Sequence, residues 1–169
     1  MMPLLRFLSI LALLGSLGLN AQETPSFDRY LVQINEDVRL ASVDYSLIDE
    51  AAAAAAAFES RLTEMSGRAA NIGGHYFLGE IGCGTMCQTA ILVNLETGIA
   101  IAQSTFGLGS CYQPDSNLLI LNPYVSENFY EDEDIPDWLY TQYYLIEDDE
   151  LRFLEKTKQS YAGECVSGQ

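Results

Sequence analysis

Six short β-rich runs follow one another between residues 75 and 157, and a turn signal or a glycine-rich segment separates each from the next. The runs are HYFLGEIG, QTAILVNL, IAIAQSTF, SNLLILNPY, YTQYYLI and LRFLEKT. Runs of this length, separated by Gly, Asn, Asp and Pro, are typical of antiparallel strands joined by short connections. The pattern therefore predicts an antiparallel β-meander of about five to six strands. Two weaker strands are expected upstream, at residues 31–34 and 38–43.

A helix is predicted ahead of these strands, over residues 46–66. Ser46 and Asp49 have the spacing of a capping box, and Gly67 provides a natural end. Apolar residues recur at three- and four-residue spacing, at Leu47, Ala51, Ala54, Phe58, Leu62 and Met65. A single apolar stripe of this kind usually packs on the core of its own domain. The predicted fold class is α+β, with one N-terminal amphipathic helix on a face of the meander.

Residues 1–21 are predicted to be a secretory signal peptide. Arg6 precedes an apolar run from Phe7 to Leu19, and Asn20-Ala21 supplies a small residue for cleavage. The run is shorter than the roughly 20 apolar residues that span a bilayer. Residues 22–169 are then one exported domain of 169 − 21 = 148 residues, either periplasmic or secreted, without a membrane contact after cleavage.

The chain is strongly acidic, with 8 Lys and Arg against 24 Asp and Glu. Without Arg6 the mature protein has a net charge of 7 − 24 = −17. Nucleic acids and anionic lipids are disfavoured as partners, because their phosphates require neutralisation by basic side chains. A cationic protein is the macromolecular partner that such a charge favours. The sequence contains no indication of oligomeric state.

The segment SENFYEDEDIPDW, residues 126–138, concentrates six of the carboxylates. It lacks the Gly and the terminal Glu of a calcium-binding loop. A solvated loop is expected, since charge runs usually mark exposed segments. The alternative is docking of a basic partner, with Phe129, Tyr130 and Trp138 as aromatic anchors.

The glycine-rich knot GCGTMC, residues 82–87, has three interpretations. Cys83 or Cys87 could act as a nucleophile with His75, the only histidine, as its base. His75, Cys83, Met86 and Cys87 would also suit Cu(I) if the thiols were reduced. The third interpretation is a disulfide across a turn, because export and an even number of cysteines favour two disulfides.

The disulfide interpretation accounts for the most residues. Gly82 and Gly84 permit the backbone to reverse between two strands, and a Cys83–Cys87 bridge would make the turn rigid. Cys111 would then pair with Cys165. Four cysteines allow three pairings, and the sequence does not choose among them. The candidate binding surface comprises the knot and the two residues that begin the strand before it, that is His75, Tyr76, Gly82, Cys83, Gly84, Thr85, Met86 and Cys87.

The segment from Ala69 to Gly98 resembles small exported bacterial proteins of unknown function. Their pattern is Asn-x-x-Gly-His-Tyr, a strand, Gly-Cys-Gly-x-x-Cys, a second strand and a Thr-Gly turn. Its positions here are Asn71, Gly74, His75, Tyr76, Gly82, Cys83, Gly84, Cys87, Thr97 and Gly98. The resemblance implies export and a coherent domain but no activity. A second likeness, to periplasmic inhibitors of animal lysozyme, lies in a short cysteine-bracketed loop between antiparallel strands.

These features predict an exported, disulfide-stabilised binding or envelope protein that is not an enzyme and needs no cofactor. An inhibitor of a cationic hydrolase such as lysozyme is the first alternative, and charge complementarity would speed such an association. A hydrolase or a copper binder that uses His75 is the second alternative. No catalytic residue is assigned, because the chain lacks a Gly-x-Ser-x-Gly elbow and a Cys-x-x-Cys redox motif.

Overall fold

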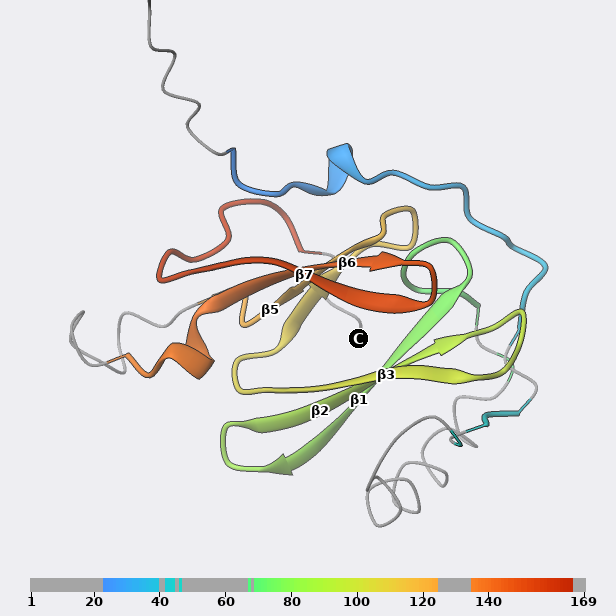
Figure 1. Ribbon diagram of the computed structural model, residues 1–169, viewed down its shortest axis with the longest axis horizontal. Coiled ribbons are helices and arrows are strands. Elements are labelled where there is room, and N and C mark those ends of the chain that lie inside the picture. Colours follow the sequence, from blue (N-terminus) through green and yellow to red (C-terminus); the bar gives the residue numbers. More distant parts are fainter. Residues whose placement is uncertain are drawn as a thin grey trace, which may run out of the picture.

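A computed structural model describes residues 23–39, 42–44, 46, 67, 69–124 and 135–165. These residues form two antiparallel sheets, as Figure 1 shows. The three-stranded sheet has the order β1-β2-β3, and the four-stranded sheet has the order β4-β5-β6-β7. The strand bounds are Tyr76–Gly84 for β1, Cys87–Asn94 for β2, Ala100–Phe106 for β3, Ser110–Tyr112 for β4, Leu118–Leu121 for β5, Thr141–Glu147 for β6 and Glu150–Thr157 for β7. Two 3-10 turns complete the elements, η1 at Phe27–Arg29 and η2 at Asp137–Leu139.

The two sheets pack face to face around a common core. Alternate residues of each strand point into it, for example Leu92 of β2 and Leu119 of β5, which are 1% and 0% exposed. The neighbouring residues on those strands, Ile91 and Leu118, point outward and are still fully buried. Strands that are buried on both faces contain continuous apolar runs, which is the pattern of ILV in β2 and LLIL in β5.

The outer face of the four-stranded sheet is covered by both ends of the described chain. Phe27 of η1 packs there with Tyr161, and their rings meet edge to face at 5.7 Å. The Cys111–Cys165 disulfide joins the C-terminal segment to β4 on the same face. The Cys83–Cys87 disulfide closes the β1–β2 hairpin. Both predicted disulfides are therefore confirmed, with the pairing that a bridged knot requires.

The predicted single meander is wrong, because the chain leaves the first sheet after β3. Asn122 Oδ1 accepts hydrogen bonds from the backbone N–H groups of Gly107 and Leu108, at 2.9 and 2.8 Å. Gly109 has φ +81°, a conformation that favours glycine. The strand that follows, β4, pairs with β5 and not with β3. A buried polar side chain thus stabilises the transition between two sheets at a place where the sequence predicts only a connection.

The α+β assignment is also wrong, since the described residues are β-rich and their only helices are the two three-residue 3-10 turns. The segment predicted as a helix, residues 46–66, lies outside the described residues apart from Ser46. Residues 126–134, most of the acidic segment, lie outside them as well. No helix in the described ranges is long and apolar enough to cross a membrane.

The predicted strands differ in outcome. All six runs between residues 75 and 157 contain a strand, with boundaries within a few residues of those expected. The upstream pair does not form strands in its described part: Leu31 makes an isolated bridge to Ser116, and Asp44, directly after the second run, makes one to Ile99. Strand β4 was not predicted, because three residues between a glycine turn and Pro114 are too few to show a period.

Candidate functional site

The turn before β1 is the point where three distant segments meet. Gly73 and Gly74 have φ values of +60° and +77°. A Cβ on Gly74 would lie 2.3 Å from the carbonyl oxygen of Gln33, so only glycine allows the N-terminal segment to pass this close. The backbone N–H of Gly74 donates to the carbonyl of Pro114 at 2.8 Å, and the N–H of Asn35 donates to the carbonyl of Gly74 at 2.8 Å.

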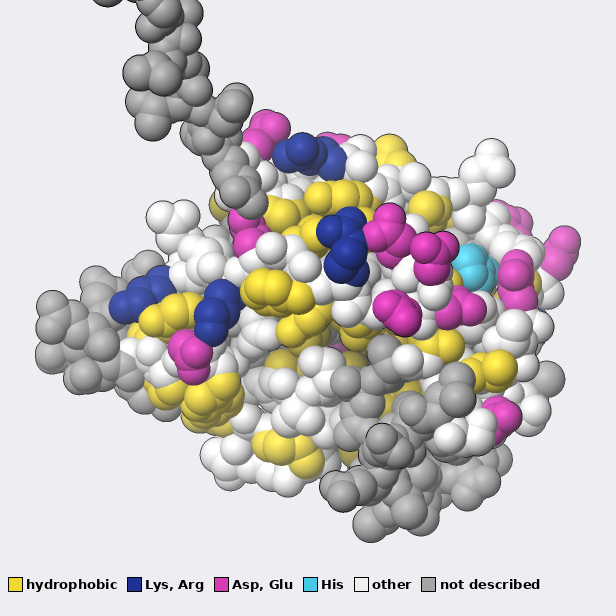
Figure 2. Space-filling view, viewed as in Figure 1, with side chains coloured by type: hydrophobic (Ala, Val, Ile, Leu, Met, Phe, Trp, Pro, Cys, Tyr) yellow, Lys and Arg dark blue, Asp and Glu magenta, His cyan; other side chains and the backbone are white. Residues whose placement is uncertain are grey.

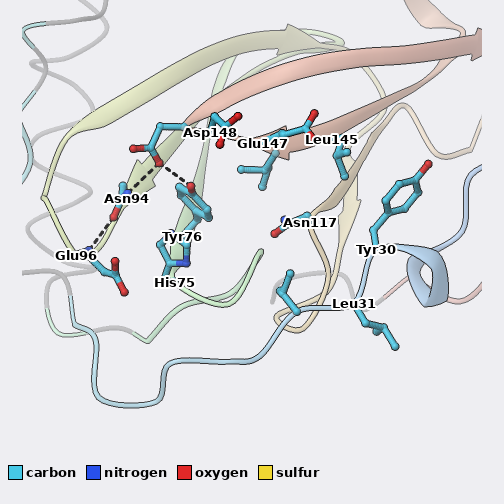
Figure 3. A pocket seen from close by; sticks show the side chains of 13 residues that line it. Tyr30, Leu31, His75, Tyr76, Asn94, Glu96, Asn117, Leu145, Glu147 and Asp148 are labelled. Atoms are coloured by element: carbon cyan, nitrogen blue, oxygen red, sulfur yellow. Dashed lines mark hydrogen bonds between the residues drawn. The ribbon is translucent and has the colours of Figure 1, made fainter.

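Val32 and His75, which directly adjoin this junction along the chain, line a pocket of about 700 Å³. Figure 3 shows Tyr30 and Leu31 of the N-terminal segment on one side, across from Asn94 and Glu96, which lie in and directly after β2. The complete lining is Tyr30, Leu31, Val32, His75, Tyr76, Asn94, Glu96, Asn117, Leu145, Ile146, Glu147, Asp148 and Asp149. Tyr30 and Leu31 therefore face a side that carries amide and carboxylate groups together with the rings of His75 and Tyr76.

Asp149 connects the two sheets at the polar side of the pocket. Its Oδ1 accepts a hydrogen bond from the Tyr76 hydroxyl at 2.6 Å and another from Asn94 Nδ2 at 2.9 Å. Figure 3 draws both bonds as dashed lines. Burial, reinforced by the hydrogen bond to the Asp149 carboxylate, raises the pKa of the Tyr76 phenol well above its usual value of 10.0. Tyr76 is therefore neutral at physiological pH and serves as a fixed donor.

The position of Asp149 depends on an unusual two-residue turn between β6 and β7. Asp148 and Asp149 both have positive φ, +51° and +61°, which is the geometry of a type I′ hairpin turn. Asn-Gly or Asp-Gly is the preferred pair at these positions, because a side chain in this region is strained. Two aspartates are present instead, and both line the pocket. Strained residues of this kind concentrate at functional sites.

The carboxylates of the pocket exceed the positive charge near them. Of the four carboxylates that line the pocket, only Glu147 has a basic partner among the described ion pairs, Arg152 Nε at 2.6 Å. Glu96, Asp148 and Asp149 are exposed and join no such pair there, and no Lys or Arg lines the pocket. Figure 2 shows acidic side chains, in magenta, gathered around His75, in cyan. This region is a patch of negative potential with a cavity in it.

His75 lies in the pocket wall without an acid–base partner. Its ring stacks on the ring of Tyr76, with centroids 4.1 Å apart and planes tilted by 35°. Within the described part of the chain, its imidazole makes no hydrogen bond or ion pair with a carboxylate. The lining contains no Ser, Thr or Cys that could act as a nucleophile. The rings of His75 and Tyr76 form an aromatic surface in the pocket wall, which is suited to binding.

The structure divides the predicted binding residues into two groups. His75 and Tyr76 line the pocket, whereas Gly82, Cys83, Gly84, Thr85, Met86 and Cys87 occupy the opposite end of the β1–β2 hairpin. At 3.3 Å per residue, the eight steps from Tyr76 to Gly84 correspond to about 26 Å. The residues of the copper alternative are separated in the same way, and its two cysteine sulfurs are joined in a disulfide. The described residues contain no cluster of three or more His, Cys, Asp or Glu side chains that could hold a metal ion.

The knot itself is packed on one side and open on the other. Met86, with φ +53°, packs against Ile135 and Leu139 near η2. Gly82, Cys83, Gly84 and Thr85 are exposed. The knot remains a predicted binding surface, but it forms no cavity with His75 and Tyr76.

Local sequence signals do not identify the residues that complete the pocket. Residues 95–98 and 147–150 are expected only as turns between the β-rich runs, and nothing local indicates that Asp149 would reach Asn94. Tyr30 and Leu31 carried only a weak strand signal. The exposure of Leu31, at 59%, follows from its place at the pocket rim.

Several residues of the resembled pattern have clear structural roles. The side chain of Asn71 makes two hydrogen bonds to the backbone of Leu78. Its Oδ1 accepts from the Leu78 N–H at 2.7 Å, and its Nδ2 donates to the Leu78 carbonyl at 3.0 Å. Gly98 has φ +77°, and a Cβ there would lie 2.7 Å from the carbonyl oxygen of Ser42. No family model, no curated protein and no solved structure matches this chain.

Proposed function

We propose that this protein is an exported binding protein that is not an enzyme, and that its acidic pocket captures a basic side chain of a cationic protein. The two disulfides suit the oxidising compartment that export implies, periplasmic or extracellular. The resemblance to small exported proteins supports the same location. A basic hydrolase such as lysozyme belongs to the proposed class of partner.

The observation that carries this proposal is the uncompensated charge of the pocket. Glu96, Asp148 and Asp149 gather at one cavity without a described basic partner, while Tyr76 and Asn94 hold the Asp149 carboxylate in place. A carboxylate that is already oriented loses little freedom when it accepts a cation. Asn117 Oδ1, at the same cavity, is a buried acceptor without a partner in the described residues, and an N–H donor would satisfy it.

The shape of the lining selects a long basic side chain. Lys and Arg combine an aliphatic stem with a charged end, and the pocket combines an apolar side with an acidic side. The stem would lie along Leu31, Val32 and Leu145, and the cation would reach Asp148 and Glu96. The faces of Tyr30 and His75 offer additional aromatic contact. The overall negative charge of the chain would accelerate encounter with such a partner, and salt would weaken this effect.

The test measures binding of the mature protein, residues 22–169, to a basic lysozyme by calorimetry at low and at physiological salt. The informative variant is Glu96→Gln combined with Asp148→Asn. It removes two charges, preserves shape and leaves the Tyr76–Asp149–Asn94 contacts intact. We expect affinity to fall on the order of tenfold, and the salt dependence to decrease.

The matched control is Asp28→Asn with Glu164→Gln, which removes the same charge from exposed sites outside the pocket. If this pair weakens binding as much as the pocket pair, only net charge matters and the pocket is not the site. Absence of binding to any basic protein would contradict the proposal. Hydrolytic turnover by the wild type, abolished in a folded His75→Ala variant, would establish the hydrolase alternative instead.

A further inference from the structure

The two disulfides differ sharply in their access to solvent. Cys111 is 0% exposed and lies in the core cluster of Phe27, Leu118, Ile120 and Tyr143, against which Cys165 also packs. Cys83 is exposed and Cys87 is half-buried, at the outer end of a hairpin. One disulfide is therefore part of the interior, and the other belongs to the surface.

The approach to Cys83 is open on both sides along the chain. The residues on either side of it are Gly82 and Gly84, which have no side chains. A Cβ built on either glycine would find no heavy atom within 4 Å, so the space around them is empty. The Thr89 hydroxyl donates to Cys83 Sγ at 3.6 Å. Cys83 is exposed and flanked by open space, so an incoming small thiol can approach it.

We propose that the Cys83–Cys87 disulfide is a site of thiol–disulfide exchange with small thiols, and that Cys83 Sγ is the atom attacked. An incoming thiolate forms a new S–S bond with Cys83, while the Cys83–Cys87 bond breaks and Cys87 leaves as a thiolate that takes up a proton. A second thiolate then attacks the small-thiol sulfur of this mixed disulfide, the bond between that sulfur and Cys83 Sγ breaks, and Cys83 leaves as a thiolate that takes up a proton. This step releases the oxidised small disulfide and leaves Cys83 as a thiol. Access to the sulfur is one of the factors that control the rate of such exchange.

Opening the disulfide should alter the hairpin end alone. The bridge spans a separation of only four residues, and the β1–β2 ladder continues beyond it from Gly82↔Gln88 to Tyr76↔Asn94. Met86 holds a left-handed conformation between the two cysteines, and release of the bridge removes one constraint on it. The change can be followed because Met86 and the only tryptophan, Trp138, both approach Gly107. If Gly107 carried a Cβ atom, that atom would lie 3.0 Å from the carbonyl oxygen of Met86. It would lie 2.8 Å from Cζ3 of Trp138.

The experiment treats the mature oxidised protein with glutathione or with cysteamine for increasing times, followed by acid quenching, alkylation and peptide mass spectrometry. We expect exchange at Cys83–Cys87 to be at least about tenfold faster than at Cys111–Cys165. The first adduct should lie on Cys83, with the alkyl group on Cys87. Cysteamine, which is cationic, should react faster than anionic glutathione at equal thiolate concentration because the protein is acidic.

Trp138 emission supplies an independent readout. Partially reduced wild type and a Cys83→Ser/Cys87→Ser variant should show the same emission change while keeping their circular dichroism. Simultaneous opening of both disulfides would overturn the proposal. So would a first adduct on Cys87, or loss of the fold when the knot opens. None of these outcomes depends on whether the acidic pocket binds a partner.

Discussion

Removing one disulfide at a time should destabilise the protein to two different degrees. The Cys111–Cys165 bridge spans a sequence separation of 54 residues and the Cys83–Cys87 bridge one of 4. A cross-link stabilises chiefly by restricting the unfolded chain, and its effect grows with the logarithm of the loop it closes. The chain-entropy relation gives about 4 kcal/mol for the long loop and about 2 kcal/mol for the short one.

Burial increases this difference. Cys111 is fully buried, so a Cys111→Ala/Cys165→Ala variant also loses packing in the core cluster of Phe27 and Tyr143. The exposed Cys83 contributes no such packing, so a Cys83→Ala/Cys87→Ala variant should lose only the restriction that the cross-link places on the unfolded chain. For a domain of this size, each kcal/mol corresponds to about 2–4 °C in Tm. The cross-links alone therefore correspond to losses of about 8–16 °C and about 4–8 °C respectively, and the lost packing adds to the first.

The assay is thermal and urea unfolding of the mature protein, followed by far-ultraviolet circular dichroism. As a control, both variants and the wild type are also unfolded in excess reductant, where the differences due to cross-linking should largely disappear. Equal losses, or a larger loss for the knot variant, would refute the reasoning. Such a result would mean that the knot stabilises the native hairpin directly, beyond its effect on the unfolded chain.

Three further predictions concern the pocket and the core. Gly74→Ala should lower the free energy of unfolding by at least about 2 kcal/mol and loosen the N-terminal segment, because its Cβ would meet the Gln33 carbonyl. Gly82→Ala, whose Cβ would lie in open space, should change the free energy of unfolding by less than about 0.5 kcal/mol. Equal effects of the two variants in urea unfolding would contradict the close approach at Gly74. Tyr76→Phe should lower the free energy of unfolding by about 0.5–1.5 kcal/mol, since it removes one hydrogen bond to an exposed carboxylate. A decrease above about 3 kcal/mol in urea unfolding would show that the hydroxyl does more than orient Asp149. Burial raises the pKa of Tyr112 and of Tyr143 to about 12, with Glu80 and Glu155 adding to the respective shifts. A pKa raised in the folded state gives stability that is present below the unfolded value of 10.0 and lost as the pH rises from about 10 towards about 12. Resistance to urea unfolding should therefore fall steeply above about pH 10, and phenolate absorbance should show Tyr76, Tyr112 and Tyr143 ionising late. A flat stability profile would contradict the burial of Tyr112 and Tyr143.

Local chemistry accounts for the parts of the structure that could be predicted. The strands at residues 75–157 are visible in sequence because side chains alternate between faces along a strand and turn residues mark each end. The disulfides followed from the predicted export and the even number of cysteines, and a Cys83–Cys87 bridge left one partner for Cys111. Where a run is short or its period is weak, as in β4 and around Leu31, local signals were insufficient.

The division into two sheets and the pocket between distant segments were decided by tertiary structure. Asn122 directs the chain out of the first sheet through hydrogen bonds to Gly107 and Leu108, which lie more than ten residues away in sequence. In the sequence, the turn that contains Asp149 has the pattern of an ordinary solvated acidic hairpin. Its role is apparent only from the hydrogen bonds that Asp149 accepts from Tyr76 and Asn94. The sequence by itself determined which residues pair with their neighbours along the chain, because that depends on local periodicity. Which faces pack together, and which carboxylates therefore share a cavity, depends on contacts between segments that no local period encodes.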